Sequence, residues 1–194
     1  MSWRSTYLLI IGFWLWIGVN SVYSQRGEQL AKLAETLEDS TVQYVPSYVS
    51  IPYPMGDVPK GTGVCTDVVI RAFRLISIDL QQEVHEDMSN HFSEYPHKWG
   101  ASSTDKNIDH RRVPNLMKYM ERQGWDVGIS DSVQHYLPGD IVAWNLGGGL
   151  THIGIVTTDT SQNGIPLIIH NIGGGQVMED ILFEFEIMGH YRIQ

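Results

Sequence analysis

The stretch LPGDIVAWNLGGGLTHIGIVTT, residues 137–158, decides the fold class of this chain. Two apolar runs within it, 140–145 and 151–158, contain β-branched residues and tryptophan and flank the glycine triplet 147–149. Short apolar runs joined by a glycine turn are typical of neighbouring antiparallel strands. Because apolar runs and turns keep alternating to the C-terminus, the sequence predicts an antiparallel meander with further strands at 166–171, 183–185 and 191–193.

The chain upstream of this stretch carries the periodicity of helices instead. Apolar residues at i, i+3, i+4 and i+7 predict an amphipathic helix over 26–38. The segment 42–63 is rich in proline and glycine and is expected to be an extended lead-in. Helices that come first and strands that follow predict an α+β fold. Further helices are expected from Cys65 onward, over 80–92, and between Pro114 and Gly124.

The N-terminus has the three-part layout of a secretory signal. A short segment with one charge, Arg4, precedes an uncharged apolar run over 7–19, and Val22-Tyr23-Ser24 fits a cleavage tripeptide. We therefore expect residues 1–24 to be removed, which leaves a periplasmic or secreted protein with no stable membrane span. The alternative is an uncleaved signal anchor, although the run is shorter than the roughly 20 residues that span a bilayer.

Charge and cysteine content exclude several classes of function. The 22 acidic residues outnumber the 13 Lys and Arg, for a formal net charge of −9. Such a chain offers no general phosphate-binding surface, so nucleic acid is not an expected partner. The single cysteine, Cys65, excludes an intrachain disulfide and a multi-cysteine metal site. We expect no cofactor and no metal; a metal hydrolase built on Asp109 and His110 is an alternative that lacks a recognised ligand spacing.

Cys65 stands where a thiol becomes nucleophilic. It follows Gly61-Thr62-Gly63 and opens a predicted helix, whose N-terminal N–H groups and dipole stabilise a thiolate. The glycine-bearing turn also lets backbone N–H groups point at a developing oxyanion. The alternative is an inert buried cysteine, which is common for this residue type.

Two histidines on neighbouring strands can serve this cysteine. His152 opens an apolar strand after the glycine turn, and Gly154 on the same face leaves room for another group to approach. His170 closes the next strand, and antiparallel pairing returns it to the side of His152, as a base-orienting residue requires. Asn171 points to the opposite face, so only one of His170 and Asn171 can take that role. The alternative is that both histidines are ordinary half-buried strand residues.

The motifs around these residues resemble a known family. LPGDIV at 137–142, THIGIV at 151–156 and a cysteine at a helix start are similar to the NlpC-type papain-like cysteine peptidases. The stretches SIPYPMGDVPKGTGVCTDVVIRAFR, DKNIDHRRVPNL, LPGDIVAWN and PLIIHNIGGG resemble more closely a bacterial envelope family, domain of unknown function 1287. The resemblance implies a papain-like fold with Cys65 as nucleophile, His152 as general base and acid, and His170 as orienting residue.

The resemblance also implies a reaction and a domain organisation. It implies an exported hydrolase, a cysteine peptidase or amidase, that cleaves an amide bond, typically in peptidoglycan stem peptides. A signal over 1–24 and an N-terminal helix over 25–41 then precede the hydrolase domain, 42–194. The alternative is a non-catalytic module that binds the cell wall through a papain-like cleft.

Substrate contacts are expected from two further regions. Tyr53 corresponds to a tyrosine that lines the relatives' cleft. The family's Asp-Cys-Ser step is Val64-Cys65-Thr66-Asp67 here, so Asp67 either contacts a substrate amine or stabilises the helix dipole. In the run 109–112, Arg111 and Arg112 suit a substrate carboxylate or form a surface pair. Asp109 and His110 complete that run and the expected substrate-binding set.

Overall fold

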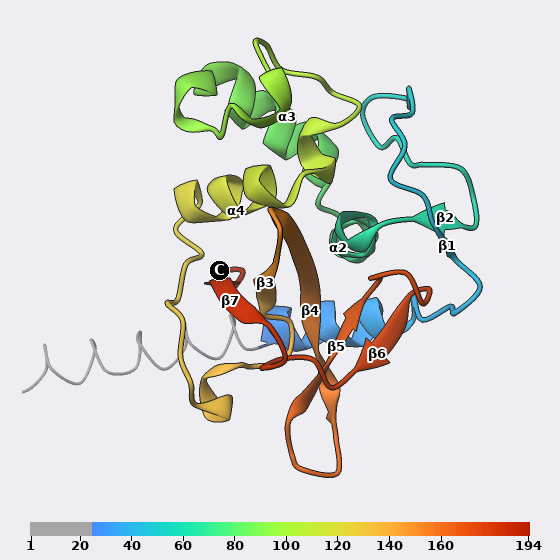
Figure 1. The fold of residues 1–194 in the computed structure, drawn as a ribbon, viewed down its shortest axis with the longest axis vertical. Coiled ribbons are helices and arrows are strands. Elements are labelled where there is room, and N and C mark those ends of the chain that lie inside the picture. The colour runs from blue at the N-terminus through green and yellow to red at the C-terminus, as the bar shows by residue number, and fades with distance from the viewer. Residues whose placement is uncertain (1–24) are drawn as a thin grey trace, which may run out of the picture.

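The computed structural model describes residues 25–194, and the predicted signal sequence, 1–24, lies outside the described residues. The described chain is α+β, as the sequence predicts: helices form in its first part and an antiparallel sheet in its second (Figure 1). No helix within residues 25–194 combines the length and the apolar character that crossing a bilayer requires.

The helices form where apolar periodicity and capping residues predict them. Residues 25–35 are helical, and α2 (Cys65–Leu75), α3 (Leu80–Asn90) and α4 (Val113–Arg122) follow. The carboxylate of Asp79 caps α3 by accepting from the N–H of Gln81. Pro114 lies in the first turn of α4. Short 3₁₀ helices connect these elements: η1 (Phe92–Glu94), η2 (Lys98–Gly100), η3 (Asp109–Arg111) and η4 (Val133–His135).

The sheet has the strand order β6-β5-β4-β3-β7, with antiparallel neighbours throughout. β3, β4 and β5 are the first three strands of the predicted meander, and β6 extends it by a strand that was not predicted. The last strand crosses back to the free edge of β3, which the meander prediction did not include. The strands are β3 (Ile141–Gly147), β4 (Leu150–Thr160), β5 (Pro166–His170), β6 (Val177–Glu179) and β7 (Glu186–Tyr191).

The prediction of the last strand pair was wrong. Residues 183–185 form a turn, in which the ring of Phe183 packs edge-on against Tyr136 at 5.6 Å between ring centroids. The alternating Phe-Glu-Phe pattern therefore reflects a turn that covers the sheet rather than a strand. The segment 191–193 was also misplaced, because β7 ends at Tyr191. The short strand β6, with the sequence VME, lacks the apolar run that would have revealed it.

Both faces of the sheet are buried. Ile153, Ile155 and Ile169 share one apolar cluster with α2 and α4, whereas Val156 and Ile168, one residue along each strand, belong to a second cluster. Successive side chains on a strand point to opposite faces, which explains the two clusters. Burial on both faces also explains why the segments 153–156 of β4 and 167–169 of β5 contain no polar residue instead of alternating.

The lead-in segment holds one short ladder that the sequence did not predict. β1 (Gln43–Tyr44) pairs in parallel with β2 (Thr62–Gly63). A Cβ at Gly63 would lie 3.1 Å from the Arg71 guanidinium and 3.3 Å from the Asp67 side chain. The ladder and this close approach hold the backbone that leads into Cys65.

Candidate active site

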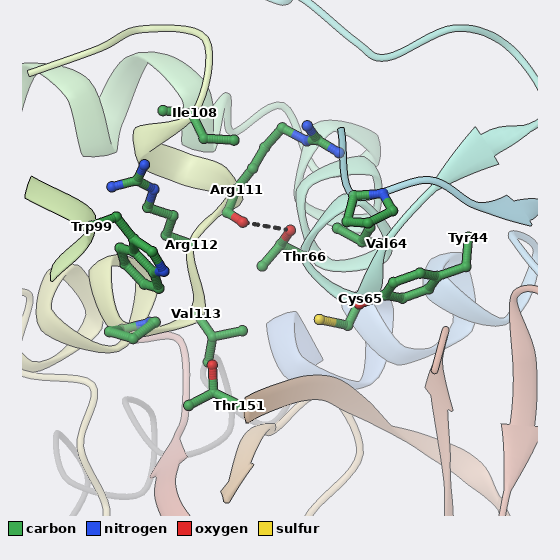
Figure 2. Close-up of a pocket in the computed structure, with 12 residues that line it drawn as sticks. Tyr44, Val64, Cys65, Thr66, Trp99, Ile108, Arg111, Arg112, Val113 and Thr151 are labelled. Atoms are coloured by element: carbon green, nitrogen blue, oxygen red, sulfur yellow. Dashed lines mark hydrogen bonds between the residues drawn. The ribbon is translucent and has the colours of Figure 1, made fainter. Parts of the chain in front are cut away.

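Cys65 is the first residue of α2 and borders a pocket of about 160 Å³. Its side chain is 4% exposed, and Figure 2 shows the sulfur directed toward the space next to Val113 and Thr151. The pocket is therefore bounded by the N-terminal ends of α2 and α4 and by the start of β4. Its lining residues are Tyr44, Pro46, Val64, Cys65, Thr66, Trp99, Ile108, Arg111, Arg112, Val113, Pro114 and Thr151.

The sulfur of Cys65 faces the edge of β4 where its pairing with β5 has ended. The N–H of Val156 donates to Asp140, on the β3 side, so the N–H of Ile153, three residues earlier, points toward β5. The β4–β5 pairing ends at Ile155 with Ile169. The Ile153 N–H is therefore outside the ladder and faces the Cys65 sulfur, and together with the N–H of Thr66 it favours the thiolate.

Burial keeps both the cysteine and the adjacent histidine neutral. It raises the pKa of the Cys65 thiol to about 12, against the opposing effect of the Ile153 and Thr66 N–H groups. Burial, together with His170, lowers the pKa of His152 to about 3. At neutral pH the resting site therefore holds a thiol and an imidazole rather than a thiolate–imidazolium pair.

His152 and His170 form a buried hydrogen-bonded pair, as the strand reading predicts. Nε2 of His152 lies 2.9 Å from Nδ1 of His170, and Nε2 of His170 lies 3.0 Å from a carboxylate oxygen of Glu179. Glu179 ends β6, so the failure to predict that strand also hid this residue. Asn171 instead accepts from the N–H of Gly173, and His170 is the residue bonded to His152.

Gly154 makes the histidine contact possible. The pairing of Ile155 with Ile169 places Gly154 opposite His170, with His152 one step along the same face. A Cβ at Gly154 would lie 2.5 Å from the Ile168 side chain and 3.1 Å from Cβ of His170. Any larger residue would push β5 away from β4.

Cys65 and His152 lie beside the same segment of β4, but no hydrogen bond in the described chain joins them. Ile153, whose N–H faces the sulfur, is the residue after His152. The ring of His152 packs beside Trp144, with 5.7 Å between centroids. Within residues 25–194 no hydrogen bond joins Cys65 to His152, and Nδ1 of His152 is the ring nitrogen not used by His170.

Asp67 and Arg111 are tied to each other. The Arg111 Nε and Nη2 donate to the two carboxylate oxygens of Asp67 at 2.9 and 3.0 Å, a bidentate geometry, and both side chains are almost fully buried. Asp67 also accepts from the N–H of Val64 at 2.7 Å. Asp67 therefore caps α2 and anchors Arg111, and neither charge is left for a substrate.

Arg112 has a different environment from its neighbour. Its guanidinium lies 4.5 Å from the centroid of the Trp99 ring, and both residues line the pocket with Cys65 (Figure 2). Within the described part of the chain Arg112 has no carboxylate partner. The hydroxyl of Thr66 donates to the carbonyl oxygen of Arg111, which ties the start of α2 to this segment.

The structure does not bring the remaining expected contact residues into the pocket. The Tyr53 ring packs edge-on against His85 on α3, and its hydroxyl faces Glu86 at 3.5 Å. Asp109 accepts from the backbone N–H of Asp105, and burial raises its pKa. His110 is buried, and burial lowers its pKa to about 3. In residues 25–194 no group of three or more His, Cys, Asp or Glu side chains is arranged to hold a metal ion.

Comparison with known proteins places this chain in one family. A protein of Escherichia coli (strain K12), described as "Uncharacterized protein YijF", is 52% identical over 153 residues, which cover 79% of this chain and 75% of that protein. No solved structure matches the chain significantly. A family model, described as Domain of unknown function (DUF1287), matches residues 31–193. The chain therefore belongs to the DUF1287 family.

Proposed function

We propose that this protein is an exported, papain-like cysteine hydrolase that cleaves an amide bond, with peptidoglycan stem peptides as its substrates. One observation carries the proposal: Cys65 opens α2 at a pocket, and its sulfur faces the N–H of Ile153, one residue along β4 from the buried His152–His170 pair. A nucleophile, a base and an orienting group in this order are what acyl transfer to cysteine requires.

The proposed reaction proceeds through an acyl-enzyme. The Cys65 sulfur attacks the amide carbonyl while Nδ1 of His152 takes the thiol proton, which forms the C–S bond and a tetrahedral oxyanion. Collapse breaks the C–N bond, and His152 returns the proton to the leaving amine. Water then adds to the thioester and gives a proton to His152. Collapse breaks the C–S bond, and His152 returns the proton to the sulfur, which releases the carboxylic acid and restores the thiol.

The neutral resting site makes proton transfer part of the attack itself. A thiol with a pKa of about 12 is not ionised before substrate binds, so a base must remove its proton as the C–S bond forms. This step requires Nδ1 of His152 and the sulfur to come within hydrogen-bond distance. Catalytic contacts of this kind are often long in the free enzyme and tighten in the complex.

The environment of Arg112 favours a substrate that carries a carboxylate. It is a cation without a carboxylate partner in the described chain, and it borders the same pocket as Cys65. A planar guanidinium held against Trp99 suits bidentate binding of a carboxylate. Stem peptides are rich in carboxylates, and the predicted signal sequence supports export to the compartment that contains them.

A non-catalytic cell-wall binding module is the second candidate. The raised pKa of Cys65 and the absence, within residues 25–194, of a Cys65–His152 hydrogen bond favour it. In that case the pocket binds a peptide carboxylate through Arg112 without turnover.

The test is mass analysis of purified muropeptides after incubation with wild type or with Cys65→Ala. The proposal expects new fragments with wild type and at least an approximately 1,000-fold lower rate with the variant. Wild type and variant that bind muropeptides equally, with no fragments from either, establish the binding module. Alkylation of Cys65 by iodoacetamide at neutral pH, measured in parallel, reports whether the thiol can be activated at all.

A further inference from the structure

We infer that Glu179 is a positioning residue that sets the tautomers of both buried histidines and so leaves Nδ1 of His152 as the base nitrogen. This inference rests on the proposed function only for its effect on turnover; the tautomers themselves follow from two side-chain contacts, Glu179 with His170 and His170 with His152. Glu179 reaches the pair from β6, across from β5, and does not line the Cys65 pocket.

The carboxylate of Glu179 fixes the tautomer of His170. An ionised carboxylate can only accept hydrogen bonds, and Glu179 is half exposed, so its charge is solvated. Nε2 of His170 lies 3.0 Å from Oε2 of Glu179 and must therefore carry the hydrogen. Since burial holds His170 neutral against the opposing effect of Glu179, its Nδ1 carries a lone pair.

The tautomer of His170 in turn fixes that of His152. Nδ1 of His170 can only accept, so at 2.9 Å the Nε2 of His152 must donate to it. Burial also keeps His152 neutral, which leaves its Nδ1 without a hydrogen. A proton acceptor is therefore present on the one nitrogen that the histidine pair does not use. Among the described residues, the titratable groups that act on this pair are the two rings themselves and Glu179.

Without Glu179, no acceptor holds the hydrogen on Nε2 of His170. Without the carboxylate, His170 can donate from Nδ1 to Nε2 of His152, and His152 then carries its hydrogen on Nδ1, where it cannot accept the thiol proton. Glu179 also balances the imidazolium that forms when His152 is protonated, through the bonded ring of His170. Both effects lower kcat, whereas KM is unaffected because Glu179 does not line the pocket.

The direct test is long-range ¹H–¹⁵N NMR of the histidine side chains, which identifies the nitrogen that carries hydrogen and needs no substrate. Wild type is expected to show Nε2–H for both His152 and His170, and Glu179→Ala is expected to shift His170 toward Nδ1–H. Glu179→Met, which keeps the length of the side chain but offers no strong acceptor, serves if the alanine variant fails to fold. Asp180→Asn is the matched control, since it removes a neighbouring exposed carboxylate that bonds to neither histidine.

The kinetic arm separates this inference from the proposed function. With muropeptide hydrolysis as the assay, Glu179→Ala should lower kcat about 10- to 100-fold at unchanged KM and shift its pH profile, while Asp180→Asn stays at wild-type rates. If wild type shows no turnover, the proposed function fails, yet the NMR spectra still decide the tautomers. Nδ1–H on His170 in wild type, or tautomers that do not change in Glu179→Ala and Glu179→Met, would overturn the inference.

Discussion

The substitution Gly154→Ala tests the close packing on which the histidine pair depends. The new Cβ would lie 2.5 Å from Cγ2 of Ile168, whereas carbon atoms in contact prefer about 3.5–4.0 Å. The methyl group therefore displaces β5 from β4 by roughly 1 Å or forces Ile168 off its rotamer, at a cost of about 1–3 kcal/mol of folding stability. The backbone of Gly154 is not in the left-handed region, so the effect is one of packing alone.

The same displacement lengthens the contact between His152 and His170. A 2.9 Å hydrogen bond that lengthens by about 1 Å is lost, and misplacement on this scale can cost roughly 100-fold in rate. Urea unfolding measures the loss of stability, and muropeptide hydrolysis measures the loss of rate. Gly174→Ala is the matched control, because a Cβ at Gly174 would contact nothing within 4 Å and its backbone requires no glycine.

A double-mutant cycle separates packing from other effects of the methyl group. Ile168→Ala alone opens a cavity and costs about 2–4 kcal/mol, but it removes the atom that the Gly154→Ala methyl would meet. The double variant is therefore expected to be more stable than the sum of the single losses by about 1 kcal/mol or more, with part of the activity recovered. Additive losses, or a Gly154→Ala protein with wild-type stability and rate, would refute the packing argument.

Three further predictions concern charge. Arg112→Ala should raise KM about 10-fold or more for a peptide that bears a carboxylate and leave KM unchanged for the matching carboxamide peptide. Equal effects on both peptides in steady-state assays would contradict the proposal that Arg112 binds a substrate carboxylate. Asp67→Asn should destabilise the fold by about 3–5 kcal/mol in urea unfolding, because it leaves Arg111 buried without its charge partner, and adding Arg111→Met should recover part of that loss. Burial lowers the pKa of His110 and His152 to about 3, so below pH 6.5 the unfolded chain takes up protons that the folded chain does not. The free energy of unfolding should therefore fall between pH 6.5 and pH 3, by about 1 kcal/mol per pH unit for each histidine. His110→Gln should make this slope shallower in urea unfolding measured across that pH range.

Local patterns predicted the elements that carry the candidate site. Helical spacing behind Cys65 predicted α2, and the apolar runs after His152 and before His170 predicted β4 and β5. Period-two alternation then placed both histidines on one face, and antiparallel pairing brought them together. Each step uses only residues close in sequence or one hairpin apart, which is why the sequence sufficed.

Local sequence patterns could not predict the contacts between segments that are far apart in the chain. Arg111 and Arg112 are indistinguishable as a pair of cations in the sequence, yet η3 turns one toward Asp67, buried and bidentate, and leaves the other at the pocket beside Trp99. Asp67 is 44 residues from Arg111, and no periodicity relates the two positions. Which charges neutralise each other is decided only when the segments pack.

The sequence by itself therefore determined the α+β class, the cysteine at a helix start and the histidines on neighbouring strands, because these follow from local periodicity and short-range pairing. Only the tertiary structure decided that β7 returns to β3, that β6 delivers Glu179 to His170, and that burial keeps Cys65 and His152 neutral. The physical reason is that strand order, long-range ion pairs and desolvation depend on which surfaces meet, and those surfaces come from segments far apart in the chain.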